Sequence, residues 1–312
     1  MRKYLKQWEW PDVHDMRRNN KADPKECSTD FTGRLAVITG ATSGIGRLTA
    51  YEYAAHGADL LVVNRNEEQS KALGEEIRDR YRVRCEYRIA DYTRISNVKK
   101  IGQDLLSLDR HIDVLIHNAG VYSTTRQFTA NNMELVFQVN YLASFILNYM
   151  LKDKLKERGK TRILLVNSEG HRFALSGIHL DDLRWDRRHY SGLVGYGAAK
   201  TAQILSMFKF TECFEGSAVT INAMHPGNVK TSLGENNGRL YRFYKHHVVN
   251  ARARNPQISA KALFYLGASE ELEGISGKFF NLTTEEKPAP HARDRAVAEE
   301  LWKISIELGG LA

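Results

Sequence analysis

Tyr196 and Lys200, in the run YGAAK, are the two residues best suited to moving a proton. On a helix, positions i and i+4 share a face, so both side chains would project together. A tyrosine with its ordinary pKa of about 10 is rarely a phenolate at neutral pH, and a nearby ammonium group lowers that pKa by favouring the charged form. Such a pair can protonate an alkoxide or deprotonate an alcohol.

Ser168 and Asn140 are the next candidates. Ser168 follows the apolar run TRILLVN, which is typical of a buried strand, so its hydroxyl would lie at the carboxyl end of a sheet and could bind the same substrate oxygen. Asn140 falls on an apolar helical pattern that runs from Asn131 to about Arg158. A buried Asn needs a hydrogen-bond partner, so it is either a structural clamp to a neighbouring strand or a participant in the chemistry.

A glycine turn, TGATSGIG, separates the apolar run Leu35–Ile38 from an amphipathic segment, and a second apolar run follows at Leu60–Val63. That order predicts strand, turn, helix and strand. Glycines allow close backbone approach to a pyrophosphate, and the free N–H groups of the helix start favour negative charge. The spacing of Gly40, Gly44 and Gly46 is not the common G-x-G-x-x-G, so the flanking strand and helix carry most of the signal.

Asn64 and Arg65 end the second apolar run, where the adenosine ribose is read in such folds. An acidic residue there would bind a free 2′-hydroxyl and repel a 2′-phosphate. This chain has an arginine instead, which favours NADP(H) over NAD(H). The competing interpretation is that Arg65 is one more exposed arginine on a basic protein.

Two further strand ends are candidates for cofactor contact. Asp91 follows a short predicted strand and could bind the adenine amino group, or it could cap the helix that follows. Asn118-Ala119-Gly120 follows the buried run Asp113–His117, and a turn of small residues permits close approach of a cofactor.

These candidates need a sheet whose strand ends converge. Strand and helix patterns alternate without a linker, which predicts one doubly wound α/β domain, a Rossmann fold with a parallel sheet, over residues 30–312. Residues 1–29 form an extension that we expect to pack on its own domain or on a second subunit. The other predicted elements are helices at 66–81, 94–106, 131–158, 258–266 and 293–308 and strands at 84–90, 113–117, 161–167, 218–224 and 277–281, with His225-Pro226-Gly227 breaking the strand before it.

Composition sets broad limits on the protein. The 312 residues are 42% hydrophobic, ample for a sizeable core, and the formal charge of +8 is spread along the chain. Cys27, Cys85 and Cys213 have neither disulfide-framework nor zinc spacing, so we expect no metal and a reducing compartment. No run is long and apolar enough for a membrane span, so we expect a soluble, cytoplasmic protein.

The motifs TGATSGIG, NAG at 118–120, Asn140, Ser168 and YGAAK, in this order, resemble the short-chain dehydrogenase/reductase family over about residues 31–312. The runs VNSEGH, SGKFFN and LWKISIELGGL are similar to the branch that includes retinol dehydrogenases. His117 and Asn167 depart from the usual family residues.

The resemblance implies roles for individual residues. Tyr196 would be the general acid/base, Lys200 would bind the nicotinamide ribose and lower the tyrosine pKa, and Ser168 would polarise the carbonyl. Asn140 would complete a proton relay through a water. The implied cofactor contacts are Gly40, Ser43, Gly44, Ile45 and Gly46 at the pyrophosphate, Asn64 and Arg65 at the 2′-phosphate, Asp91 at the adenine, Asn118, Ala119 and Gly120 on the adenosine side, and Pro226, Gly227 and Thr231 at the nicotinamide end.

Substrate specificity should reside in the segment 169–193 and in a lid at about 228–256, because both follow strands whose ends hold the nicotinamide. The lid interleaves apolar and basic residues: Leu240, Tyr241, Phe243 and Tyr244 with Arg239, Arg242, Lys245, Arg252 and Arg254. Its aromatics would suit an apolar carbonyl compound such as a steroid, an isoprenoid or a long-chain aldehyde. Its charges could meet an anionic substrate tail or an anionic membrane surface, or simply face solvent.

The function expected is hydride transfer between NADP(H) and an apolar carbonyl or alcohol, with a homo-oligomer as one assembly. The alternative is a catalytically silent nucleotide-binding regulatory or scaffold protein, which would not need the full proton-relay set. A nucleic-acid-binding protein is disfavoured, because the chain has no basic-aromatic motif or zinc spacing.

Overall fold

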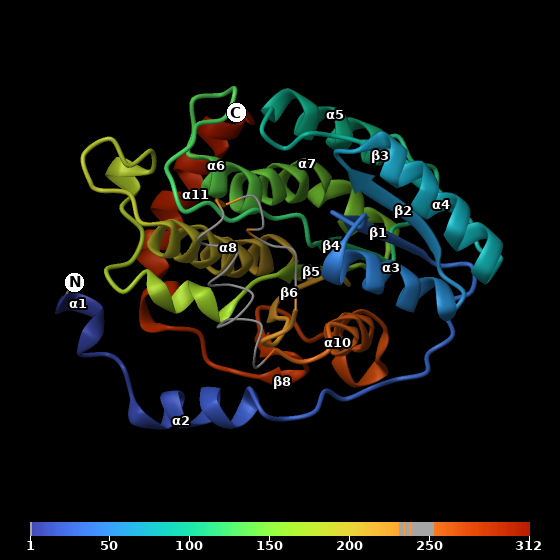
Figure 1. Cartoon of the computed structure of the whole chain (residues 1–312), viewed down its shortest axis with the longest axis horizontal. Coiled ribbons are helices and arrows are strands. Elements are labelled where there is room, and N and C mark those ends of the chain that lie inside the picture. The colour runs from blue at the N-terminus through green and yellow to red at the C-terminus, as the bar shows by residue number, and fades with distance from the viewer. Residues whose placement is uncertain (1, 231–233, 235–236, 239–252) are drawn as a thin grey trace.

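A computed structural model describes residues 2–230, 234, 237–238 and 253–312. Thr231 and the lid residues between 239 and 252 lie outside the described residues. Within the described part, one sheet has eight strands in the order β3-β2-β1-β4-β5-β6-β7-β8 (Figure 1). The strands are β1 (Leu35–Thr39), β2 (Asp59–Asn64), β3 (Cys85–Ile89), β4 (Val114–His117), β5 (Arg162–Val166), β6 (Thr220–His225), β7 (Phe279–Asn281) and β8 (Thr284–Glu285).

All neighbouring strands from β3 to β7 are parallel, and only β8 runs antiparallel, to β7. Parallel sheets are covered on both faces, which explains why their strands read as continuous apolar runs. In β1, Leu35 and Val37 belong to one core cluster while Ala36 and Ile38 belong to the other. The predicted doubly wound single domain is confirmed.

Helices cover both faces of this sheet (Figure 1). On one face lie α3 (Gly44–Ala55), α4 (Glu67–Tyr81) and α10 (Gln257–Ala268), and on the other lie α5 (Ile95–Leu106), α7 (Ala143–Arg158) and α8 (Gly192–Cys213), against which α11 (Arg295–Gly309) packs. Because β1 lies between β2 and β4, the strand order reverses beside β1, and the crevice at the carboxyl ends of these strands is where such sheets bind ligands.

The long helix expected from Asn131 begins later and is interrupted. Residues 129–133 form a turn closed by Thr129 and Met133, and the helical part starts at α6 (Leu135–Phe137). It continues through η1 (Gln138–Leu142), a π-helical segment, into α7. The buried carboxylate of Glu134 accepts hydrogen bonds from the N–H groups of Val136 and Phe137, which explains the later start.

Smaller corrections concern the strand ends. His225 belongs to β6 and does not break it, and the last strand starts at Phe279 and turns back into β8, which was not expected. The polar segment after Ser168 contains two short 3-10 turns, η2 (Glu169–Phe173) and η3 (Leu180–Asp182). The three cysteines are free thiols.

The N-terminal arm, residues 2–29, lies against its own domain. It contains α1 (Arg2–Leu5) and α2 (Trp10–Asn19) and then runs extended past β8 towards α10 (Figure 1). The Lys25 N–H donates to Thr283 Oγ1, and the guanidinium of Arg254 donates to the carbonyl of Ala22. None of the helices in the described ranges is long and apolar enough to cross a membrane, and these ranges contain no His, Cys, Asp and Glu cluster that could hold a metal ion.

Candidate active site

The glycine turn packs tightly against the turn after β4. Gly40 has φ +70°, and a Cβ there would lie 2.8 Å from the Ala119 Cα. A Cβ at Gly46 would collide with the carbonyl oxygen of Gly40 and with Asn118 Nδ2. Asn118 holds the turn from the other side, because Nδ2 donates to the carbonyls of Thr39 (3.0 Å) and Gly40 (2.9 Å). Asn118 therefore shapes the predicted cofactor loop.

The start of α3 is open to an anion. Ser43 is its N-cap residue, is exposed and makes no side-chain capping hydrogen bond. Gly44 (φ +54°), Ile45 and Gly46 begin the helix, and the first N–H groups of a helix have no partner within it. An uncapped helix start beside a loop in which a Cβ would clash fits a pyrophosphate group, as the sequence predicted.

Asn64 and Arg65 at the end of β2, and Asp91 after β3, lie at the carboxyl edge of the sheet, where a nucleotide ribose could bind. Asn64 Oδ1 accepts the N–H of Ala41 (2.7 Å), so Asn64 orders the loop, while its buried Nδ2 has no partner among the described residues. Arg65 is exposed and makes no hydrogen bond or ion pair with another described residue. Asp91 accepts the N–H (3.0 Å) and Oγ1 (2.8 Å) of Thr93.

Asp91 therefore forms a local turn and does not cap the helix, so that alternative is wrong. The N-cap residue of α5 is Arg94, and the N–H of Ile95 donates to Asn131 Oδ1 instead.

Tyr196 and Ser168 are brought together, as expected. Tyr196 lies near the start of α8, Ser168 follows β5, and the Ser168 hydroxyl lowers the tyrosine pKa through a hydrogen bond. Burial acts more strongly and raises the pKa of Tyr196 to about 12. Gly170 leaves room for the ring, since a Cβ there would lie 2.8 Å from Tyr196 Cε1. The ring of Tyr122 contacts that of Tyr196 edge-on, with centroids 5.8 Å apart.

Lys200 is buried beneath the tyrosine. Its Nζ donates to the carbonyl of Val166 (2.7 Å) and to Gln203 Oε1 (3.1 Å), and it lies 5.7 Å from the centroid of the Tyr196 ring. Burial lowers the pKa of Lys200 to about 7. The expected lowering of the tyrosine pKa by this ammonium is not found in this geometry, because the lysine bonds to other groups and burial dominates at Tyr196.

Asn167 and Gln203 connect the candidate catalytic residues, and sequence reasoning missed this role. Asn167 Oδ1 accepts the N–H of Ser168 (2.8 Å), and its Nδ2 donates to the carbonyl of Lys200 (2.9 Å) and to Gln203 Oε1 (3.1 Å). From its sequence position, Asn167 is distinguished only as a departure from the family pattern. The position of a buried amide directly before Ser168 was the available signal.

Asn140 acts as a clamp. Its Oδ1 accepts the N–H of Val121 (2.7 Å), and its Nδ2 donates to the carbonyl of the same residue (2.9 Å). Asn140 thus clamps the turn after β4 and not a strand, and its part in a relay through a water stays a prediction. The residue lies in the π-helical segment η1, and such segments often occur at functional sites. The departing residue His117 is buried, and its Nε2 donates to Asn148 Oδ1 (2.8 Å).

The nicotinamide end is described in part. Pro226 and Gly227 (φ +79°) follow β6, and the Pro226 carbonyl accepts the hydroxyl of Ser259 (2.5 Å). The start of the predicted lid is tied down by Asn237, another residue that sequence reasoning missed. Asn237 Oδ1 accepts the N–H of Thr124 (2.6 Å), and its Nδ2 donates to the carbonyl of Tyr122 (2.9 Å).

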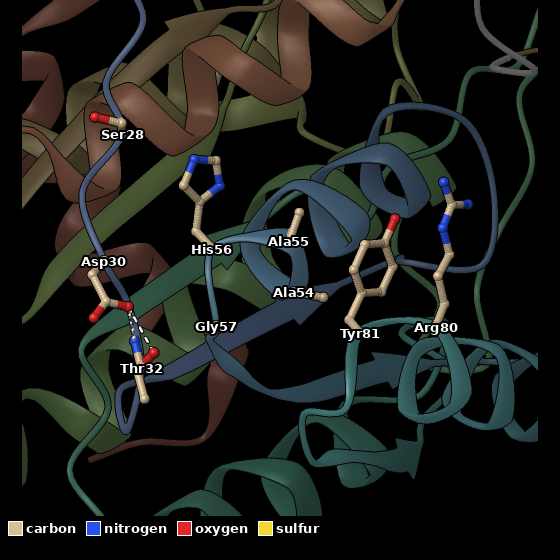
Figure 2. Close-up of a pocket in the computed structure, with 9 residues that line it drawn as sticks. All are labelled: Ser28, Asp30, Thr32, Ala54, Ala55, His56, Gly57, Arg80 and Tyr81. Carbon is tan, nitrogen blue, oxygen red and sulfur yellow. Dashed lines mark hydrogen bonds between the residues drawn. The ribbon is translucent and has the colours of Figure 1, made fainter.

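Two surface concavities lie elsewhere. One, of about 550 Å³, is lined by residues 28–32 at the end of the arm and the start of the domain, by the end of α3 and by the end of α4, including Ser28, His56 and Arg80 (Figure 2). The other, of about 490 Å³, lies around Phe214 and Gly274. Neither is lined by Ser168, Tyr196 or Lys200. The candidate catalytic residues therefore lie at the strand ends and not in either of these concavities.

The geometry has a definite chemical capacity. The Ser168 hydroxyl and the Tyr196 phenol lie together at the carboxyl edge of the sheet, next to the buried amine of Lys200. The uncapped start of α3 lies at the same edge. This arrangement can hold a substrate oxygen, exchange a proton with it and bind a nucleotide phosphate nearby.

Comparison with known proteins identifies the family of the chain. A family model described as short chain dehydrogenase matches residues 34–178. Retinol dehydrogenase 13 of Mus musculus is 32% identical over 287 residues, which span 90% of this chain and 85% of that protein. Retinol dehydrogenase 14 of Homo sapiens is 32% identical over 295 residues, which span 89% of this chain and 87% of that protein.

Among solved structures, an uncharacterized protein from Mycobacterium paratuberculosis superposes with a TM-score of 0.71 at 25% identity, covering 90% of this chain and 95% of its own. The chain therefore belongs to the short-chain dehydrogenase/reductase family of oxidoreductases, in its retinol dehydrogenase-like branch.

Proposed function

We propose that this protein is an NADP(H)-dependent oxidoreductase that transfers hydride between the nicotinamide and an apolar carbonyl or alcohol. The observation that carries the proposal is the grouping of Ser168, Tyr196 and Lys200 at the sheet edge that also holds the uncapped start of α3. A nicotinamide bound at this edge supplies the hydride.

In this mechanism, Ser168 and Tyr196 hold the substrate oxygen between their hydroxyl groups. Tyr196 donates its proton to that oxygen during reduction and removes it during oxidation. A pKa of about 12 keeps the phenol protonated at neutral pH, the form that carbonyl reduction needs. Lys200, with a pKa of about 7, is poised to gain or lose a proton beneath it and is proposed to bind the nicotinamide ribose. Asn140 is proposed to pass the proton onward through a water.

The preference for NADP(H) rests on Arg65. Its side chain is exposed and makes no contact with another described charged group, so it is available to a 2′-phosphate. Arginine binds phosphate oxygens in a bidentate manner, which makes it a suitable reader of that group. Asp91 does not place an acidic group at the end of β2 that would repel a 2′-phosphate. It follows β3 instead and accepts a hydrogen bond from Thr93.

The preference for an apolar substrate has support near Tyr196. Phe173, at the end of η2, is 50% exposed, and Leu193, one turn before Tyr196 on α8, is 52% exposed. A Cβ at Gly197 would lie 3.2 Å from the Phe173 Cβ, so the phenylalanine lies next to the candidate catalytic helix. Two exposed apolar side chains, one on the helix that carries the tyrosine and one on the turn packed against that helix, suit a steroid, a retinoid-like compound or an aldehyde or ketone with an apolar body. We also propose a cytoplasmic location, which cell fractionation can test.

The test is a fluorescence titration with NADPH and NADH, followed by oxidation of the bound NADPH with a panel of steroid, retinoid, aromatic and aliphatic aldehydes and ketones. Tight NADPH binding with turnover of a panel member is the expected result. Tight binding without turnover of any member would favour a silent nucleotide-binding protein. Failure to bind either nucleotide would refute the proposal at its first step.

A further inference from the structure

The arm reaches the segment that follows Ser168. Tyr4 is buried, and its hydroxyl donates to Asp294 Oδ2 (2.9 Å), the residue that caps α11. Its ring lies against Gly177, where a Cβ would come within 2.9 Å of Tyr4 Cε2. Gly177 has φ +80°, a conformation that favours glycine. The arm therefore packs into the substrate-side segment 169–193 and not only onto the outer helices.

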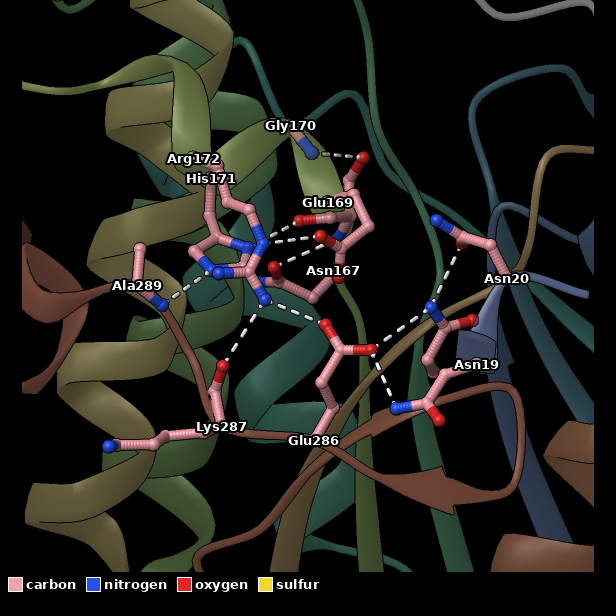
Figure 3. Close-up of polar contacts among 12 residues, drawn as sticks. Asn19, Asn20, Asn167, Glu169, Gly170, His171, Arg172, Glu286, Lys287 and Ala289 are labelled. Atoms are coloured by element: carbon pink, nitrogen blue, oxygen red, sulfur yellow. Dashed lines mark hydrogen bonds and ion pairs between the residues drawn. The ribbon is translucent and has the colours of Figure 1, made fainter. Parts of the chain in front are cut away.

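A buried arginine of this segment joins it to the residues that follow β8. Arg172, in η2, is 8% exposed and lies between two carboxylates (Figure 3). Its Nε donates to Glu169 Oε2 (2.5 Å), and its Nη2 donates to Glu286 Oε1 (2.7 Å) and to the carbonyl of Lys287 (3.2 Å). A buried charge is tolerated only when it is paired and hydrogen-bonded, so the position of η2 depends on both carboxylates.

The short turn η2 is built around Ser168. Ser168 is its N-cap residue, and its Oγ accepts the N–H of Gly170 (2.9 Å). The Ser168 carbonyl contacts His171 Nδ1 (2.8 Å), and His171 Nε2 accepts the N–H of Ala289 (3.0 Å). Gly170 and His171, the two residues directly before Arg172, thus bond the hydroxyl and the carbonyl of Ser168. A shift of the arginine would be transmitted to Ser168 within one turn.

The arm completes the arginine site. Glu286 Oε2, the oxygen that Arg172 does not use, accepts Asn19 Nδ2 (3.0 Å) and Asn281 Nδ2 (3.3 Å). Asn281 Nδ2 also donates to Asn20 Oδ1 (2.9 Å). The Arg172 guanidinium lies 5.6 Å from the ring centre of Trp8, another arm residue. Trp8, just before α2, therefore contacts Arg172, and Asn19, the last residue of α2, bonds Glu286.

We propose that the N-terminal arm is part of the active-site support: Asn19 fixes Glu286, Glu286 fixes Arg172, and Arg172 is a positioning residue for Ser168. This inference rests on the proposed function only for its effect on turnover. The coupling of the arm to the Ser168 turn is a property of the fold itself and is measurable without a substrate.

The primary test uses Asn19→Ala in the full-length protein, with Lys25→Met as the matched control. Lys25 also joins the arm to the domain, through an ion pair with Glu271 (2.6 Å), but this contact lies on the exposed surface and does not lead to Arg172. Hydrogen–deuterium exchange is followed for peptides that cover 168–174 and the glycine loop at 40–46. We expect Asn19→Ala to speed exchange about tenfold in the first peptide and to leave the second unchanged.

Turnover separates positioning from mere stabilisation. For Asn19→Ala we expect kcat to fall about tenfold while the Kd for NADPH stays within about twofold, because small displacements of a positioned group reduce the chemical step. For Arg172→Met we expect a fall in kcat of about 100-fold, with partial recovery in Arg172→Lys, which retains the charge but cannot bind both carboxylates equally. Adding Asn19→Ala to Arg172→Met should cause little further loss, as expected for residues in one chain of contacts.

Unchanged exchange at 168–174 in Asn19→Ala would overturn the coupling, and faster exchange with unchanged kcat would overturn the positioning role. An equal loss of kcat in Lys25→Met and in Asn19→Ala would also overturn the positioning role, because the loss would then come from a general loosening of the arm. If Arg172→Met does not fold, Asn19→Ala alone decides. Absence of turnover in the wild-type protein would count against the proposed function, and the exchange rates would still decide whether the arm supports the turn.

Discussion

The buried amine of Lys200 makes a quantitative prediction about folding stability. Lys200 is 4% exposed, and burial lowers its pKa from 10.5 to about 7. The amine therefore binds a proton less readily in the folded than in the unfolded protein. Between about pH 7 and pH 10.5 the unfolded state holds more protons, so the contribution of this lysine to stability rises with pH in that window.

The size of the effect follows from the shift. A difference of about 3.5 pKa units corresponds to about 5 kcal/mol of destabilisation below pH 7, where the amine is charged in both states. Over the measurable range from pH 6 to pH 9, the linkage relation predicts a recovery of about 2.6 kcal/mol. Lys200→Met has no ionisable group at this site, so its free energy of unfolding should not show this increase between pH 6 and pH 9.

The assay is urea unfolding of the wild type and of Lys200→Met at half-unit steps from pH 6 to pH 9. The free energy of unfolding of the wild type, minus that of the variant, should rise by about 2.6 kcal/mol across the range. Lys100→Met, which removes an exposed lysine of α5, controls for the loss of one surface charge. A difference that stays flat or falls with pH would refute the reasoning that burial disfavours the charged amine.

Three further predictions concern the candidate site. Tyr196→Phe should reduce kcat about 1,000-fold while NADPH affinity measured by fluorescence stays nearly constant, and wild-type turnover would refute its role as the proton donor. Arg65→Glu should weaken NADPH binding about 100-fold and NADH binding much less, since a carboxylate repels the 2′-phosphate; equal losses for both nucleotides would remove Arg65 from the site. Gly46→Ala should abolish nucleotide binding, because its Cβ would meet Gly40 and Asn118. Gly238→Ala, whose Cβ would meet no atom of the described residues within 4 Å, should bind normally.

Much of the fold was predictable because its signals are local. Buried parallel strands are continuous apolar runs, and the helices between them have the expected periodicity, so elements such as β2, α4 and α5 were predicted within a few residues. Less predictable were the starts and stops that depend on one side chain. Glu134 caps a helix that the apolar pattern placed earlier, and the chain turns back at β8 after only a short β7.

The candidate catalytic residues were also found from sequence, because chemistry of this kind uses residues at fixed strand and helix ends. Their electrostatics were not. The expectation that Lys200 lowers the pKa of Tyr196 treated the two residues as an isolated pair, whereas burial and the hydrogen bonds of Lys200 to Val166 and Gln203 decide both pKa values.

Local sequence patterns are enough to predict the doubly wound sheet, the glycine loop and the candidate residues at the carboxyl edge of the sheet, because each depends on neighbours a few positions away. The contacts that join Asn167 to Ser168 and Lys200, and those that join the arm to the Arg172 site, are seen only in the folded chain. Asn19 and Glu286 are 267 positions apart, and no periodic pattern relates them. Their contact exists because folding buries one charged group, and a buried charge must find its partners wherever the chain brings them.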